Sequence, residues 1–125
     1  MEHRIKKSAE PVWWALFSAG GVCFAVFVPA AILFIALLFP LGVLPTETFD
    51  FERSRAMLFS FFGLMFVGAV ICLPLYHAMH RIRHGLHDLK LGSDKTNKTI
   101  AYSIATLFSL LALLLVLLGI LSSNI

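Results

Sequence analysis

The chain has 125 residues, of which 59% are apolar and only 14% are charged. Soluble domains carry about 45–50% apolar and about 25% charged residues, and a small domain buries the smallest share of its surface. The composition therefore excludes a water-soluble globular enzyme, and it also excludes a disordered chain. The net charge of +3 at pH 7 is modest, so the positions of the charges are more informative than their sum. We expect membrane lipid around the protein and no nucleic acid among its partners.

Three long stretches without a charged side chain predict three membrane-spanning helices. These stretches are residues 11–46, 56–76 and 99–125. A helix rises about 1.5 Å per residue, so about 20 residues cross a hydrocarbon core of about 30 Å. Within lipid the backbone must satisfy its own hydrogen bonds, which favours helices. We predict an all-α membrane protein with a single membrane-anchor domain. Its predicted spans are residues 12–39, 56–79 and 99–121.

Prolines and glycines indicate where these helices end or bend. The segment Phe39–Pro45 ends the first helix, because proline cannot continue a helix and biases the preceding residue toward extended structure. Gly92 suits the left-handed residue that terminates the second helix. Pro29 and Pro74 lie within predicted spans, where we expect them to kink or loosen the helix.

The placement of lysine and arginine predicts the orientation of the spans, because cytoplasmic connections carry an excess of these residues. The N-terminal tail and the second connection hold eight of them: Arg4, Lys6, Lys7, Arg81, Arg83, Lys90, Lys95 and Lys98. The first connection holds only Arg53 and Arg55, beside three acidic residues. We therefore expect a cytoplasmic N-terminus and a periplasmic C-terminus. The aromatic residues expected near the cytoplasmic interface are Trp13, Trp14, Tyr76 and Tyr102.

The most informative segment is the polar end of the second predicted helix, which holds four of the five histidines. At about 100° per residue, His77, His80, His84 and His87 share a face about 80° wide. Three interpretations compete: a solvated basic helix end, a metal or haem site built on His80 and His84, and a site for a quinone headgroup. A transporter would place its ionisable groups near the bilayer midplane, whereas these groups lie at one surface.

A quinone site would use the residue types found at this surface. Oxidation of a quinol releases two protons and two electrons, so it needs nearby groups that form hydrogen bonds and accept protons. Neutral histidine accepts protons near working pH, and arginine supplies a fixed positive donor. Trp14 offers an indole N–H and a flat apolar face, and we expect it at the same depth as His80 and Arg81.

Two segments carry a joint pattern that is more specific than either alone. The first starts Glu10-Pro-Val-Trp-Trp14 and continues through Leu16-Phe-Ser-Ala-Gly-Gly21. The second contains His80-Arg81, then His84, then His87-Asp88-Leu89-Lys90. With Phe39-Pro-Leu-Gly42 and Leu73-Pro-Leu, they resemble the family of fumarate reductase D subunits, which are membrane anchors. The third span matches that family only in length and apolarity.

The resemblance implies a three-span component of a bacterial quinol:fumarate reductase in the inner membrane. Such anchors pair with a second membrane anchor, the C subunit, and hold a flavoprotein subunit with FAD and an iron–sulfur subunit with its clusters. They share menaquinol with these partners, and its electrons reduce fumarate to succinate in anaerobic respiration. The resemblance implies no haem, and we expect no metal ion in this chain. Family positions tied to the quinone pocket match Trp14, His80 and Arg81, and His84 matches a further family histidine.

The resemblance leaves His77 and Arg83 outside the quinone site. Arg81, in addition to its place in the quinone site, is expected to help Arg83 and Lys90 dock the soluble subunits. Two alternatives remain open at this point. One is a succinate dehydrogenase anchor in which a histidine of the second span ligates haem b. The other is a small stand-alone transporter.

Overall fold

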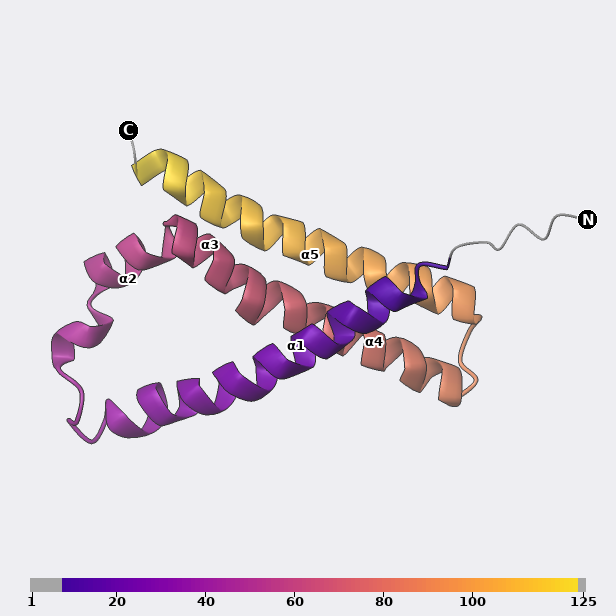
Figure 1. The fold of residues 1–125 in the computed structure, drawn as a ribbon, viewed down its shortest axis with the longest axis horizontal. Coiled ribbons are helices and arrows are strands. Elements are labelled where there is room, and N and C mark those ends of the chain that lie inside the picture. Colours follow the sequence, from indigo (N-terminus) through magenta and orange to yellow (C-terminus); the bar gives the residue numbers. More distant parts are fainter. Residues whose placement is uncertain (1–7, 124–125) are drawn as a thin grey trace, which may run out of the picture.

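The computed structural model describes residues 8–123, which form three long helical rods joined by two connections (Figure 1). The first rod consists of α1 (Glu10–Ala31) and its π-helical continuation η1 (Ile32–Leu38). The connection that follows contains a short 3₁₀ helix, η2 (Thr46–Phe49), and the helix α2 (Phe51–Leu58).

The second and third rods form a closely packed antiparallel pair (Figure 1). The second rod consists of α3 (Phe61–Val67), the π-helical segment η3 (Gly68–Cys72) and α4 (Leu73–Asp88). The left-handed residue that ends α4 is Lys90, with φ of 54°, and not Gly92 as predicted. Gly92 has a positive φ of 71° later in the same turn, and the third rod follows as the single helix α5 (Asp94–Ser123).

Three helices are long and apolar enough to cross a membrane: Glu10–Leu38, Phe61–Asp88 and Asp94–Ser123. Residues 8–123 contain no β-strand, so the predicted all-α class with three spans is confirmed. The second span starts at Phe61 and not at residue 56 as predicted, because residue 56 belongs to the separate helix α2. The hydroxyl of Ser60 accepts a hydrogen bond from the Gly63 N–H (3.1 Å) and starts α3 there. A charge-free stretch of sequence does not reveal such an internal cap.

Both intramembrane prolines lie beside a π-helical segment. Pro29 is in the last turn of α1, shortly before η1, and Pro74 is in the first turn of α4, directly after η3. Proline has no N–H to donate to the carbonyl four residues earlier, so the regular α-helical ladder is interrupted there. π-Helical turns accommodate such interruptions without ending the helix. At Pro74 the missing bond would reach residue 70, inside η3, so the predicted loosening takes this form there. At Pro29 the missing bond falls within α1, and η1 begins three residues later.

The start of α1 and the connection between α4 and α5 lie at one end of the bundle, and the connection with η2 and α2 lies at the other (Figure 1). The start of α1 lies beside the connection between α4 and α5, and the C-terminal end of α5 lies at the other end with α3 (Figure 1). This arrangement agrees with the pairing of basic segments in the sequence. The basic residues Arg4, Lys6 and Lys7, which contributed to the predicted orientation, lie outside the described residues.

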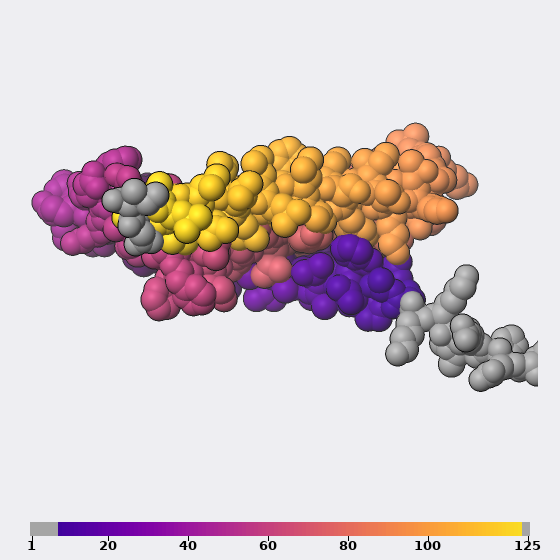
Figure 2. Space-filling view, turned by 90° about the horizontal axis from the view of Figure 1, so that it is seen from above, coloured from indigo at the N-terminus to yellow at the C-terminus, as the bar shows by residue number. Residues whose placement is uncertain are grey.

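Much of the apolar surface faces outward. The buried apolar side chains of the described residues lie along α5 and the middle of the second rod: Val67, Cys72, Ala101, Tyr102, Ala105 and Val116. Beyond its crossing with α4, the first rod diverges from α3 (Figure 1), and Figure 2 shows α5 lying along the molecule with α1 and α3 emerging beside it. Large exposed apolar side chains on all three rods suit a surface that faces lipid or other membrane proteins.

Two glycines allow α1 to cross α4 at close range. A Cβ atom added to Gly20 would lie 2.1 Å from the carbonyl oxygen of Leu73, and one added to Gly21 would lie 3.0 Å from the His77 ring. Gly20 is buried, and its contact is with backbone, which cannot move aside cheaply. Small residues permit this kind of backbone approach between membrane helices.

We expect Gly20→Ala to lower the stability of the detergent-solubilised protein by about 1–3 kcal/mol, because the added methyl group forces α1 away from α4. Gly85→Ala is the matched control, since a Cβ added to Gly85 meets nothing within 4 Å. Thermal denaturation followed by circular dichroism measures both variants. Equal midpoints for the two would show that the crossing does not depend on Gly20.

Candidate functional site

Three of the four residues predicted to bind quinone lie together where α1 crosses α4. The Trp14 ring is 4.8 Å from the His80 ring, centroid to centroid, and the two planes meet at 66°. The His84 ring lies 4.5 Å from His80 and 5.9 Å from Trp14. The indole comes from the first turns of α1, and the imidazoles come from successive turns of α4. The helical spacing of the histidines therefore presents both of them to Trp14.

Arg81, the fourth predicted residue, does not join this cluster. Its side chain is exposed, and no hydrogen bond or ion pair joins it to another residue within 8–123. Adjacent residues on a helix point about 100° apart, so a side chain next to His80 faces away from it. The exposed Arg81 side chain can therefore contact a molecule that lies against its own face of α4, outside the His80–His84 cluster.

The imidazoles carry two unsatisfied polar atoms. His80 is only 2% exposed, and the Nε2 atoms of His80 and His84 are buried with no hydrogen-bond partner among the described residues. Trp14, by contrast, is 51% exposed and lies against both rings. Buried polar atoms nearly always have a partner, and leaving one without costs about 1–3 kcal/mol. These two Nε2 atoms are therefore available to a hydrogen-bonding group from outside the described residues.

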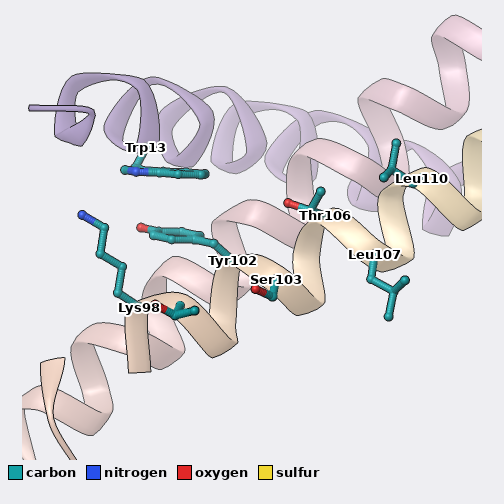
Figure 3. A pocket seen from close by; sticks show the side chains of 8 residues that line it. Trp13, Lys98, Tyr102, Ser103, Thr106, Leu107 and Leu110 are labelled. Carbon is teal, nitrogen blue, oxygen red and sulfur yellow. The ribbon is translucent and has the colours of Figure 1, made fainter. Parts of the chain in front are cut away.

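The other ring nitrogen of His80 is tied to α5. Its Nδ1 atom lies 2.6 Å from the hydroxyl of Tyr102, and this contact is buried. The Tyr102 ring stacks on Trp13 with ring centroids 4.0 Å apart and planes 8° apart (Figure 3). Trp13 and Trp14 thus point to different sides of α1, one onto α5 and the other onto the imidazoles.

His77, which the resemblance left outside the site, joins α1 to α4 instead. Its Nδ1 atom lies 2.9 Å from the backbone carbonyl oxygen of Phe17. The two rings also stack, with centroids 4.3 Å apart and planes 6° apart. Since a carbonyl oxygen only accepts, the His77 Nδ1 carries the proton and donates it to this bond.

An ion cluster of Glu10, Arg83, Asp94 and Lys98 ties the three rods together at the same end. Arg83 donates from Nε and NH2 to the two carboxylate oxygens of Asp94, at 3.1 and 3.0 Å. Its NH1 lies 3.6 Å from the Glu10 carboxylate, which also pairs with Lys98. The members of the ion cluster come from α1, α4 and α5.

The burial of Arg83 corrects its expected role. The sequence suggested an exposed side chain that docks soluble subunits, whereas Arg83 is 6% exposed and bonded within the bundle. Its guanidinium carbon also lies 6.0 Å from the centroid of the Tyr102 ring. The sequence signal for a buried Arg83 is the acidic residue Asp94 at the start of the next helix. A turn between the two helices brings Asp94 to Arg83.

Two grooves on the described surface lie away from the Trp14 cluster. One, of about 570 Å³, runs between α1 and α5 and starts at the Trp13–Tyr102 stack, with Ser103, Thr106 and Leu107 farther along (Figure 3). The other, of about 930 Å³, lies between α2 and α3 at the opposite end of the bundle. Trp14, His80 and His84 line neither groove. We call these three residues the Trp14 patch, because the Trp14 indole is its exposed part and the imidazole Nε2 atoms are buried beneath it.

The histidines do not form a metal-binding group by themselves. Across residues 8–123, no three His, Cys, Asp or Glu side chains lie close enough together to hold a metal ion. The free cysteines Cys23 and Cys72 belong to different rods, and the Cys72 thiol contacts the Ser109 carbonyl oxygen at 3.8 Å. A metal at His80 and His84 would therefore need further ligands from another chain.

Comparison with known proteins identifies the family. The family model for the D subunit of fumarate reductase matches residues 4–117. The fumarate reductase D subunit of Photobacterium profundum is 44% identical over 111 residues, covering 89% of this chain and 92% of that protein. That of Vibrio cholerae is 42% identical over 111 residues, with 89% and 85% covered. That of a Shewanella species is 38% identical over 107 residues, with 86% and 88% covered.

The chain belongs to the family of fumarate reductase D subunits. The resemblance found in the sequence is confirmed, and the match extends through most of the third span, where the sequence pattern was weak. A protein of this family is one component of a fumarate reductase complex, and three apolar rods of membrane length fit a membrane-integral component. The exposed apolar surfaces and the exposed Trp14 indole are therefore surfaces of a chain that has partner subunits.

We expect Asp94→Asn to destabilise the solubilised protein by about 1–3 kcal/mol, because the buried Arg83 charge loses its bidentate partner. Asp88→Asn removes the same charge from an exposed position at the end of α4 and is the control. A carboxylate at a helix C-terminus opposes the helix dipole, so this control should be neutral or slightly stabilising. Thermal denaturation measures both, and an unchanged midpoint for Asp94→Asn would contradict a stabilising role of the ion cluster.

Proposed function

We propose that this chain anchors the flavoprotein and iron–sulfur subunits of a fumarate reductase to the bacterial inner membrane and forms part of its menaquinol site. The observation that carries the proposal is the pair of buried, unpartnered Nε2 atoms of His80 and His84 beneath the exposed Trp14 indole. The site lies at the end of the bundle that we place at the cytoplasmic face, where basic residues are concentrated.

The chemistry of a quinol headgroup suits this patch. The headgroup is a flat apolar ring with oxygen atoms at its edge, so it can pack on an indole while its oxygens meet imidazole and guanidinium groups. The Trp14 indole covers the imidazoles in the chain alone, and a rotamer change of this exposed side chain would open Nε2 to the ligand. Arg81 lies over the same end of α4 and is free to donate to a quinol oxygen from the side.

The remaining parts of the site belong to partners in this proposal. Because the Trp14 indole is exposed, the second membrane anchor, the C subunit, and the iron–sulfur subunit supply the wall that faces it. FAD and the iron–sulfur clusters reside in the soluble partner subunits, which carry the electrons to fumarate. This chain binds and orients the quinol and contributes no catalytic residue to fumarate reduction itself. Arg81 and Lys90, at the end of the second rod, are exposed and available to dock the soluble subunits. Arg83 is buried and is not available.

We expect Trp14→Leu and His80→Leu each to slow menaquinol-driven fumarate reduction by about tenfold or more in the assembled complex, because each removes a hydrogen-bonding group from the quinol. Fumarate reduction by an artificial soluble donor should be largely intact, since it bypasses the membrane site. Steady-state rates with a short-tailed menaquinol and with the soluble donor measure both activities.

His87→Leu is the matched control for these two variants. It removes an imidazole from an exposed position of the same helix, away from the Trp14 patch. We expect both activities of this control to equal those of the unaltered complex. If Trp14→Leu and His80→Leu lower both activities together, or behave like the control, the proposed site is wrong.

The proposal also predicts that the purified complex contains no haem b. His80 and His84 lie on the same face of one helix and cannot supply both axial ligands of a haem. A haem would need its second ligand from a partner helix, and the proposal assigns the His80 Nε2 to the quinol. The reduced-minus-oxidised absorption spectrum of the complex is the measurement. A bis-histidine haem spectrum would instead favour the succinate dehydrogenase type of anchor.

A further inference from the structure

We propose that Tyr102 is a positioning residue for His80 and lets one imidazole bind both redox forms of the quinone. The inference rests on the proposed quinol site and goes beyond it by naming a residue that does not touch the ligand. Its starting point is the 2.6 Å contact between the Tyr102 hydroxyl and the His80 Nδ1 atom. Both side chains are buried, with 6% and 2% exposed, respectively.

The phenol is held by two neighbours. Trp13 stacks on it with centroids 4.0 Å apart, and the Arg83 guanidinium carbon lies 6.0 Å from the ring centroid. These contacts, with the burial of the ring, favour the position in which its hydroxyl meets His80. Its hydroxyl proton, however, rotates about the C–O bond, so the same oxygen can donate a hydrogen bond or accept one.

This freedom leaves both tautomers of His80 available. When the Tyr102 hydroxyl donates to Nδ1, the ring proton sits on Nε2, which can donate to a quinone carbonyl oxygen. When the hydroxyl accepts from Nδ1–H, Nε2 has a free lone pair, which can accept from a quinol hydroxyl. The Nε2 atom is the one that has no partner among the described residues, so it is the atom left for the ligand.

His77 shows what a different partner would do. Its Nδ1 faces the backbone carbonyl oxygen of Phe17 at 2.9 Å, and a carbonyl oxygen cannot donate. The neutral His77 ring is therefore restricted to one tautomer, with Nε2 as an acceptor only. The two histidines lie one turn apart on α4, and the chemistry of the Nδ1 partner distinguishes them.

The surroundings of His80 stay in place when the hydroxyl is removed. The charged and titratable groups near it are His77, Arg83 and His84 from α4, Glu10 from α1, and Tyr102, Asp94 and Lys98 from α5. Tyr102→Phe keeps the ring on which Trp13 stacks and leaves the ion cluster intact. It removes the hydroxyl oxygen, which contacts His80 Nδ1 and also interacts with the Arg83 guanidinium.

The test is Tyr102→Phe in the complete complex, assayed with a short-tailed menaquinol and, in the reverse direction with succinate, with the matching quinone. We expect KM to rise about tenfold for both redox forms, because the buried His80 ring loses the bond that orients it. The rate with an artificial soluble donor should be unchanged. In the background of His80→Leu, Tyr102→Phe should have no further effect, because its role acts through that ring.

Tyr76→Phe is the matched control. The Tyr76 hydroxyl also bonds a side chain, the Thr106 hydroxyl at 2.7 Å, and its ring also lies near Trp13, but it does not contact His80. We expect this variant to keep both KM values. If Tyr102→Phe matches Tyr76→Phe while His80→Leu is impaired, the inference is wrong and the quinol site stands. If His80→Leu is also unimpaired, the site itself is wrong.

Two further outcomes would overturn the inference. If Tyr102→Phe raises KM for only one redox form, the hydroxyl selects a single tautomer and does not serve both. If it lowers the artificial-donor rate to the same extent, or remains as damaging in the background of His80→Leu, its role is structural and does not act through His80.

Discussion

The buried guanidinium of Arg83 is the interaction on which the arrangement of this bundle depends. Between membrane helices the hydrophobic effect supplies little attraction, so close packing and polar contacts must hold the rods together. Arg83 meets Asp94 in a bidentate contact and Glu10 at 3.6 Å, and Glu10 also pairs with Lys98. One residue of α4 thereby joins α1 and α5. Gly20 supports the same crossing by removing the side chain that would separate α1 from α4.

The ion cluster also explains why the candidate site lies at the same end of the bundle. The ion cluster sets the ends of α1 and α5 beside α4, which places Trp14 on the imidazoles and Tyr102 behind them. At the other end the first rod diverges from α3 (Figure 1), and large apolar side chains remain uncovered. An exposed indole at the end with the ion cluster and uncovered apolar surface elsewhere are what a component of a larger membrane complex requires.

Sequence patterns predicted part of the site and missed the residues that organise it. The shared helical face of His80 and His84 and the depth of Trp14 were readable, because helix geometry and membrane interfaces set them. Arg83 and Tyr102 were not recognised, because their partners are far away in sequence or across a turn. A positive charge near a membrane surface looks the same in sequence whether it faces solvent or a buried carboxylate. Arg81 is exposed, whereas Arg83 is buried against Asp94, and the sequence does not distinguish them.

The sequence by itself determined that the chain is all-α and that it has three helices long and apolar enough to cross a membrane. These follow from local physics, since a charge-free stretch in lipid must form a helix that satisfies its own backbone. Only the tertiary structure decided that Ser60 begins the second rod, that Arg83 is internal, and that Tyr102 holds His80. Each of these depends on which helix faces which, and that is set by contacts between residues such as Gly20 and the backbone of Leu73, which no local pattern contains.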